Sequence, residues 1–396
     1  MTGASSADKG AQEGARSGPL HGLRIVEFAG IGPAPMTAML LADLGADVIR
    51  IDRLQPSGLG IAKPRQFDFL ARGRQAVAID LKHPDGVACA LDLVAAADGL
   101  VEGFRPGVME RLGLGPDACF AVNPRLVYGR VTGWGQDGPL ASAAGHDLNY
   151  IALSGALHAI GRAGAPPTPP LNLVGDFGGG GLYLAFGMVC AMLASQRSGV
   201  GQVVDAAMID GTATLMTSIY GMIGAGLHGG ERGTNILDSG APYYDVYRCA
   251  DGEYVSIAPI EDKFCAELLQ RLGLDAAAFP NMKDRSNWPA ARAILTETFG
   301  QKSRSEWCAL LEGTDVCFAP VLSASEAPRH PHVAARRTFV EIDGAIQPAP
   351  GPRFSRTSPP LPRSARECQG DTTALLQRWA IAPERVAALR TDGIVR

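Results

Sequence analysis

The hydrophobic pattern in the N-terminal half of the chain alternates between two periods. Short β-branched and apolar runs, separated by segments with helical spacing, occupy residues 23–29, 46–52, 75–81, 99–104 and 125–135. Between the first two runs, residues 36–45 (MTAMLLADLG) carry apolar side chains at the spacing of an amphipathic helix. Strands that alternate with helices in this way are typical of a mostly parallel sheet covered by helices. The pattern therefore predicts a Rossmann-like α/β domain.

The pattern changes in the second half. Residues 206–227 are predicted to form one long apolar helix, and residues 244–260 show strand alternation around an Asp-Gly turn. The tail from 340 to 363 is rich in proline and is predicted to be extended, and residues 375–390 read as a last pair of helices. The predicted organisation is a disordered tail (1–18), a large α/β domain (19–206 with 345–396), a linking helix and loop (207–239), a smaller α+β domain (240–335) and a return linker (336–344).

Composition narrows the class of protein. A chain of 396 residues that is 46% hydrophobic can fill two cores. Its net charge of −4 gives no overall attraction for nucleic acid or anionic lipid, so local basic residues must hold any anionic ligand.

The eight cysteines lack Cys-x-x-Cys spacing and read as small apolar residues of a reducing compartment. No secretory signal is visible, and the apolar stretch 182–194 is too short to span a bilayer. We expect a cytoplasmic protein that binds neither nucleic acid nor membrane.

Two glycine-punctuated turns carry the candidate chemistry. One contains Gly145-His146-Asp147, and the other has Asp176 shortly before the glycine run 178–181. An imidazole and two carboxylates in such turns can be held still and partly dry, which suits proton transfer on a carbon acid. The glycine run also predicts free backbone N–H groups at a helix start, suited to an enolate oxygen. The structural alternatives are an ordinary His–Asp pair and a helix N-cap.

A dinucleotide site is the competing interpretation of the first strand and turn. Gly30-Ile31-Gly32 follows the first strand, and Asp52 lies about twenty residues further on. The match to the dinucleotide fingerprint is partial, because Pro35 replaces the third glycine and Arg53 follows the acidic residue. The two glycines can instead serve only to let the turn pass close to a neighbouring segment.

Four basic residues, Arg53, Lys82, Arg105 and Arg111, lie in loops where phosphates can bind. A ligand with several phosphate groups needs several such cations because its phosphates are multiply charged. Taken singly, each cation also fits a solvated surface charge.

Several segments, in chain order, resemble the alpha-methylacyl-CoA racemases of the family III CoA-transferase superfamily (CaiB/BaiF type). They are residues 22–53, the GHDLNYIALSGALHAIGR segment that begins at Gly145, VGDFGGGG (174–181), and residues 201–213, 237–261 and 353–363. The resemblance implies interconversion of (R)- and (S)-2-methylacyl-CoA thioesters through an enolate, with no metal and no cofactor, since CoA is part of the substrate. It also implies an interlocked homodimer whose active sites lie between the large domain of one subunit and the small domain of the other.

The resemblance assigns roles to single residues. His146 and Asp176 match the two bases on opposite faces of the α-carbon, and Glu261 matches the residue that hydrogen-bonds the histidine. Asp147 matches the nucleophile of the superfamily's transferases, so a CoA-transferase that uses Asp147 remains the alternative. The CoA-contacting positions match Arg53, Ile79, Lys82, Gly103, Phe104, Arg105, Arg111, Gly145 and Tyr150.

Overall fold

The computed structural model describes residues 18–55 and 58–396, so the prediction for the N-terminal tail lies, apart from Gly18, outside the described residues. The chain divides into two compact units. The first, here called the sheet unit, takes the N-terminal part of the chain to Ser154 together with Leu171–Leu215 and His332–Arg396. The second, the small unit, takes Gly155–Pro170 and Met216–Pro331.

A six-stranded parallel sheet organises the sheet unit, in the order β3-β2-β1-β4-β5-β6. The parallel α/β fold is therefore confirmed. The chain runs outward from β1 to β3 and then returns to β4, which lies on the other side of β1. Where strand order reverses in this way, the loops after the two central strands diverge and leave a crevice at the carboxyl edge of the sheet. The strands are β1 (Arg24–Phe28), β2 (Asp47–Asp52), β3 (Gln75–Ala78), β4 (Gly99–Glu102), β5 (Val127–Thr132) and β6 (Gln202–Ala207).

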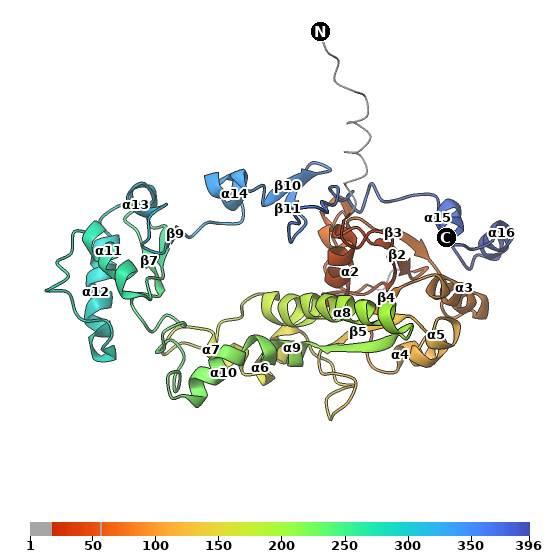
Figure 1. The fold of residues 1–396 in the computed structure, drawn as a ribbon, viewed down its shortest axis with the longest axis horizontal. Helices are drawn as coiled ribbons and strands as arrows, with labels where there is room; N and C mark the ends of the chain where they lie inside the picture. The colour runs from red at the N-terminus through yellow and green to blue at the C-terminus, as the bar shows by residue number, and fades with distance from the viewer. Residues whose placement is uncertain (1–17, 56–57) are drawn as a thin grey trace, which may run out of the picture. The chain divides into compact units, whose positions relative to one another are not determined.

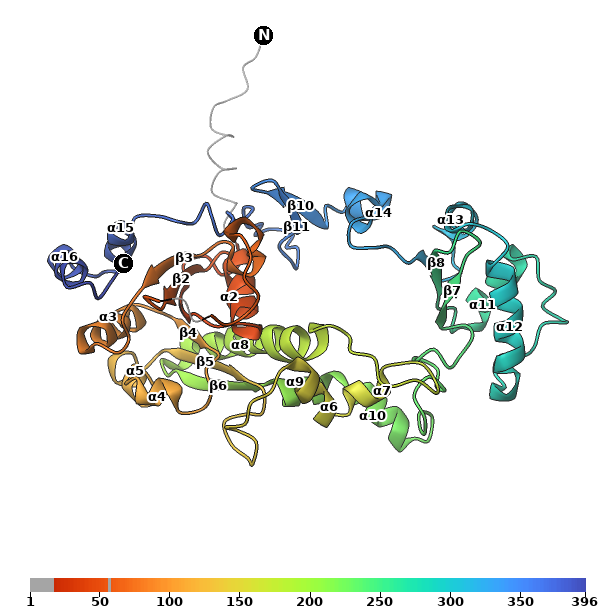
Figure 2. The same ribbon diagram turned by 180° about the vertical axis from the view of Figure 1, so that it is seen from behind.

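Helices cover both faces of the sheet, so successive residues of a central strand enter different cores. In β1, Val26 packs in a first core and Ile25 in a second. The first core contains α3 and the C-terminal helices α15 and α16, and the second contains α2 and α8 (Figures 1 and 2). The predicted C-terminal helix pair is thus confirmed. The bounds in the sheet unit are α2 (Pro33–Asp43), η1 (Arg65–Phe67), η2 (Phe69–Ala71), α3 (Pro84–Ala95), α4 (Val108–Arg111), α5 (Pro116–Val122), α6 (Asp147–Leu153), η3 (Leu173–Leu182), α8 (Tyr183–Ser198), α9 (Met208–Leu215), α15 (Thr372–Arg378) and α16 (Pro383–Thr391).

The glycine run lies inside a helix, so the prediction that it starts one was wrong. Segment η3 is a π-helical stretch that continues directly into α8. A Cβ atom on Gly179 would stand 2.7 Å from the backbone nitrogen of Thr212, and one on Gly180 would stand 2.9 Å from Cβ of Pro33. The missing side chains allow neighbouring backbones to approach, and the N–H groups of the run belong to the helix interior.

This helix is longer than the apolar stretch from which we expected no membrane span. Among the described residues, Leu173–Ser198 is the one helix with the length and composition to cross a membrane, with a mean hydropathy of 1.6. Its inner face carries Leu184, Met188 and Met192 into the second core, and a core helix of a globular protein passes the same test.

The small unit contains an antiparallel sheet of β7 (Asp245–Arg248), β8 (Tyr254–Ile257) and β9 (Phe318–Pro320). The hairpin predicted around the Asp-Gly turn is confirmed as β7 and β8. The helices that lie wholly in this unit are α7 (Ala156–Ala159), α10 (Thr217–Gly224), α11 (Asp262–Arg271), η4 (Arg285–Asn287), α12 (Trp288–Phe299), α13 (Arg304–Leu311) and η5 (Ala327–Arg329).

Two predicted elements differ from the structure. The long helix expected at 206–227 is divided, because its first two residues complete β6 and the chain passes between the units at Met216. The tail expected to be extended from 340 instead begins with a hairpin, β10 (Phe339–Ile342) and β11 (Ala345–Pro348), which follows α14 (Pro331–Ala335). Its turn residues Asp343 and Gly344 both have positive φ, as tight hairpin turns require.

Candidate active site

A cavity of about 900 Å³ opens in the sheet unit at the carboxyl edge of the sheet. Its walls come from the loops that follow β1, β2, β4 and β5, together with η3 and the loop that carries His146. This position is the crevice that the strand order creates, and the volume is within the range of small-molecule sites.

His146 lines this cavity from the N-cap position of α6. Its backbone N–H donates to Oδ1 of Asn149 at 3.0 Å, which fixes the first turn of the helix. The residue is exposed, so the imidazole is accessible to a ligand.

Asp147 serves to tie two segments together. The residue is only 6% exposed, and its Oδ1 accepts from the backbone N–H of Asp176 at 2.6 Å. A Cβ on Gly175 would stand 2.5 Å from that same oxygen, so only glycine leaves room for the bond. The bond joins the His146 loop to η3, and it explains why His146 and Asp176 line the same cavity while Asp147 does not.

Asp176 has an environment that perturbs its acidity. Burial raises the pKa of its carboxyl, and the neighbouring Asp147 raises it further, whereas a hydrogen bond from Nδ2 of Asn172 to Oδ2 at 3.2 Å lowers it. Gly32, at φ +69°, approaches the carboxylate so closely that a Cβ there would lie 3.3 Å from Oδ2. A half-buried carboxyl group with a raised pKa in a cavity is a candidate for proton transfer.

Tyr150 forms one wall of the cavity and fixes the start of the His146 loop. Its hydroxyl donates to the carbonyl of Gly145, and its ring meets Trp134 edge-on with centroids 4.7 Å apart. Burial, and then the charge of Asp176, raise the pKa of this phenol. Tyr150 therefore stays protonated and donates its hydrogen bond to the loop.

The predicted CoA-binding residues divide into two groups. One group lines the cavity, with the Arg53 guanidinium 5.8 Å from the centroid of the Phe104 ring. This group comprises Arg53, Gly103, Phe104, Arg105, Gly145 and Tyr150. The other group does not line it: Ile79 is buried in the first core, and Lys82 and Arg111 are exposed. Their contact with CoA stays a prediction.

The cavity also contains residues that the sequence analysis did not single out. Among them are Asn172, Arg50, Lys63 and Trp134. Arg50 donates from Nε to Oδ1 of Asp52 at 2.8 Å, and Lys63 pairs with Asp68 at 3.3 Å. Arg53 follows β2, whereas Arg50 lies within this strand, near its carboxyl end, where a position in a strand gave no signal of a site.

Glu261 belongs to the small unit, where it is exposed and precedes the first residue of α11. Its predicted hydrogen bond with His146 joins residues of different units and stays a prediction.

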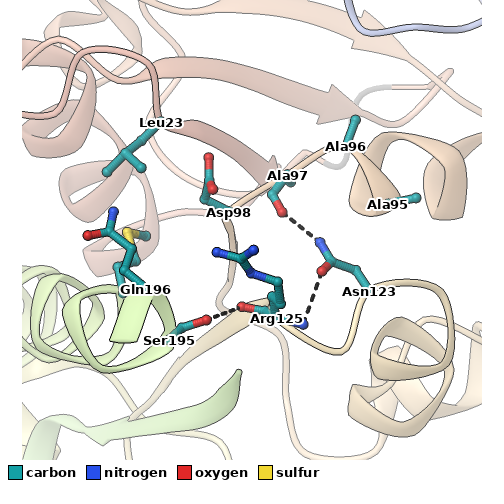
Figure 3. A pocket seen from close by; sticks show the side chains of 10 residues that line it. Leu23, Ala95, Ala96, Ala97, Asp98, Asn123, Arg125, Ser195 and Gln196 are labelled. Carbon is teal, nitrogen blue, oxygen red and sulfur yellow. Dashed lines mark hydrogen bonds between the residues drawn. The ribbon is translucent and has the colours of Figure 1, made fainter. Parts of the chain in front are cut away.

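A second, smaller cavity of about 220 Å³ lies at the amino edge of the sheet, where β4 and β5 begin (Figure 3). Its polar groups largely satisfy one another: Asn123 donates to the carbonyl of Ala97 at 2.7 Å, and Ser195 donates to the carbonyl of Arg125 at 2.8 Å. None of the predicted site residues lines this cavity. Of these two cavities, the larger one alone is lined by predicted site residues.

Comparison with known proteins gives the family. Residues 20–371 match the profile of CoA-transferase family III. This chain belongs to that family. It is 43% identical to alpha-methylacyl-CoA racemase of Mus musculus over 380 residues, which cover 95% of this chain and 97% of the racemase. It is 40% identical to alpha-methylacyl-CoA racemase of Homo sapiens over 379 residues, with the same shares covered.

The fold agrees with the family. A CAIB/BAIF family protein from Brucella suis superposes with a TM-score of 0.76 at 25% sequence identity, covering 95% of this chain and 100% of the other. The family resemblance identified from the sequence is thus confirmed.

Proposed function

We propose that this protein is a racemase of 2-methylacyl-CoA thioesters, which it interconverts by moving the α-proton between its own side chains. The similarity to two alpha-methylacyl-CoA racemases over nearly the whole chain supports the reaction class. The observation that carries the proposal is that His146 and Asp176 line one cavity on segments joined by the Asp147 hydrogen bond. CoA enters only as part of the substrate, and the chemistry needs no further cofactor.

The reaction requires two groups that together hold one proton. In one direction the ionised Asp176 removes the α-proton from one face and protonated His146 returns a proton to the other; in the reverse direction the neutral imidazole is the base. The number of protons on the pair is the same before and after turnover. Burial raises the pKa of Asp176 and so reduces the difference in pKa that usually separates a carboxyl group from an imidazole. Both arrangements of the single proton are then accessible.

The basic rim of the cavity suits the phosphates of CoA. Arg53 and Arg105 are exposed residues that line the cavity, and an arginine grips a phosphate with two parallel hydrogen bonds. Lys82 and Arg111 are proposed to meet the nucleotide outside the cavity. The apolar thioester arm fits the side of the cavity formed by Phe177 and Met208.

The proposal includes a homodimer in the cytoplasm. Helix α8 and the residue before it carry an exposed apolar stripe at helical spacing: Leu182, Phe186, Val189 and Leu193. Phe186 is 68% exposed, and a contiguous apolar face of this kind marks an interaction surface. A second copy covers it in the interlocked dimer that the resemblance implies, in which Glu261 supports His146. The eight free cysteines fit a reducing compartment.

The direct test follows each enantiomer of a 2-methylacyl-CoA in deuterium oxide by NMR, with a free carboxylic acid present as a possible CoA acceptor. We expect both enantiomers to yield the racemate with deuterium at the α-carbon, and no CoA on the acid. Transfer of CoA to the acid without α-deuterium would instead establish the transferase that uses Asp147. The burial of Asp147 and its bond to Asp176 support the first outcome.

A further inference from the structure

An acid–arginine–acid chain, Glu102–Arg130–Glu110, supports the segment 103–111, which carries four of the proposed CoA contacts; its first two members are buried and Glu110 lies on the segment itself. Glu102, the last residue of β4, is 1% exposed. Its Oε2 accepts from the backbone N–H of Phe104 at 2.7 Å, and its Oε1 accepts from Nε of Arg130 at 3.0 Å. Arg130, on the neighbouring strand β5, also donates from Nη1 to Oε1 of Glu110 at 3.0 Å.

The chain therefore fixes the segment at both ends. The Phe104 bond holds the turn that presents Gly103 and Arg105 to the cavity, and the Glu110 bond holds helix α4. Phe104 in turn lies beneath the Arg53 guanidinium. Neither Glu102 nor Arg130 lines the cavity, so neither touches a ligand there.

The surroundings make this arrangement sensitive to the charge on Glu102. Burial raises the pKa of its carboxyl to about 7, against the opposing effect of the Phe104 and Arg130 bonds. The other ionisable groups that act on it are Glu110 on α4 and Tyr128 on β5, while Asp205 on β6 acts on Arg130. A carboxylate accepts from both donors at once, whereas a protonated carboxyl turns its own proton toward one of them.

We propose that Glu102 is a positioning residue for CoA, which together with Arg130 holds residues 103–111 in the conformation that binds the nucleotide. The inference rests on the proposed function, because it takes the cavity as the CoA site. Neutralising Glu102 releases the Phe104 turn and weakens CoA binding, and it leaves the proton-transfer groups on α6 and η3 in place.

The experiment measures the binding of 3′-dephospho-CoA to the full-length protein by calorimetry between pH 6 and pH 8. This probe keeps a constant pyrophosphate charge over that range, so ligand titration does not contribute. For the wild type we expect affinity about fivefold lower at pH 6 than at pH 8, because one pH unit below its pKa most, but not all, of Glu102 is protonated. Glu102→Gln should bind 3′-dephospho-CoA about tenfold more weakly than the wild type at pH 8. Its affinity should not show the change between pH 6 and pH 8 that the titration of Glu102 causes in the wild type.

Asp43→Asn is the matched control. Asp43 is also a buried carboxylate paired with an arginine, but that arginine, Arg72, makes its other hydrogen bonds to Gln347 and Pro348 and none to residues 103–111. Its CoA affinity and pH profile should equal those of the wild type. In turnover, Glu102→Gln should raise KM about tenfold while kcat stays within about twofold of the wild type, a split that a general loss of structure does not produce.

Arg130→Lys provides a second route if Glu102→Gln fails to fold, since lysine keeps the charge but cannot bridge both glutamates. It should weaken binding at pH 8 by about the same factor. Equal affinities of these variants and the wild type across the pH range would overturn this inference alone. Failure of the wild type to bind CoA in any form would overturn the proposed function as well.

Discussion

At the scale of single residues, the two aspartates of the site have opposite tasks. Oδ1 of Asp147 accepts a hydrogen bond from the backbone N–H of Asp176, so Asp147 has a structural role. Asp176 keeps its carboxylate in the cavity, where burial raises its pKa and Asn172 limits the rise. Desolvation and the Asn172 hydrogen bond are the two largest opposing effects on the pKa of the candidate base, and the charges of Asp147 and His146 add smaller ones.

This balance predicts the effect of Asn172→Ala. The active state carries one proton on the His146/Asp176 pair, so activity falls as pH drops and the pair becomes doubly protonated. Removing the Asn172 bond raises the pKa of Asp176 further, and the acid limb of kcat/KM should move to higher pH. The measurement is the pH profile in both directions of racemisation.

The two directions provide an internal control. The equilibrium constant of a racemisation is one at every pH, so the kcat/KM values of the two enantiomers must shift together. An unchanged acid limb in Asn172→Ala would show that the Asp176 carboxyl does not take part in the rate-determining ionisation.

The candidate site residues that the sequence analysis named can be recognised within one segment, whereas those that it missed depend on other parts of the fold. His146 and Asp176 stand in glycine-punctuated turns, a signal that a single segment carries. Asn172 acts through helical spacing, one turn before Asp176, and it was missed because the helix was expected to begin later. Glu102 acquires its role from Arg130, on a neighbouring strand, which the local pattern does not reveal.

At the scale of elements, η3 places Asp176 because its glycines permit close packing. The buried glycines Gly179, Gly180 and Gly181 of η3 pack so closely against α2 and α9 that a Cβ atom would have no room. The position of the carboxylate thus depends on the absence of side chains at these glycines.

Gly179→Ala should therefore destabilise the protein. Its Cβ would press on the backbone nitrogen of Thr212, which cannot rotate away, and overpacking of this kind costs about 1–3 kcal/mol. We expect a lower Tm and a lower kcat, because the displaced helix carries Asp176. Gly221→Ala is the matched control, since Gly221 lies inside α10 and its added Cβ would meet no atom within 4 Å. A Tm equal to that of the wild type in Gly179→Ala would refute the packing role.

The predicted elements were most reliable where one period ran through a whole segment. The first five strands of the large sheet, the β7–β8 hairpin and the C-terminal helices follow such patterns, whereas β6 was not predicted. The β10–β11 hairpin was hidden by the prolines of the tail, although Asp343-Gly344 is a turn signal in the sequence. The break at Met216 follows from the division of the chain into units, which hydrophobic spacing does not encode.

At the scale of the whole molecule, the strand order determines where chemistry can occur. The strand order reverses between β1 and β4, which leaves a crevice at the carboxyl edge of the sheet. The larger cavity lies there, and of the candidate catalytic residues in the sheet unit His146 and Asp176 line it, whereas the buried Asp147 does not. The outer face of α8 remains exposed and apolar in the single chain. The proposed dimer accounts for that face.

Phe186→Asp tests this assignment. Burying an unpaired carboxylate in an apolar interface costs about 3–5 kcal/mol, so the variant should be monomeric at concentrations where the wild type is dimeric. Light scattering after size-exclusion chromatography gives the mass. Val122→Asp, which adds the same charge at a residue 43% exposed on α5, should remain dimeric. A wild type that is monomeric, or a dimeric Phe186→Asp, would contradict the assignment.

The central claim is that His146 and Asp176 exchange the α-proton from opposite faces of one substrate. The most direct measurement incubates His146→Ala and Asp176→Asn separately with each enantiomer of a 2-methylacyl-CoA in deuterium oxide and follows the α-carbon by NMR. Both variants should lose racemisation by at least about a hundredfold, the lower end for a general acid or base. Each should still exchange the α-proton of one enantiomer, and the two variants should exchange opposite enantiomers. Near-normal racemisation in either variant would contradict the claim, because a single base would then serve both faces.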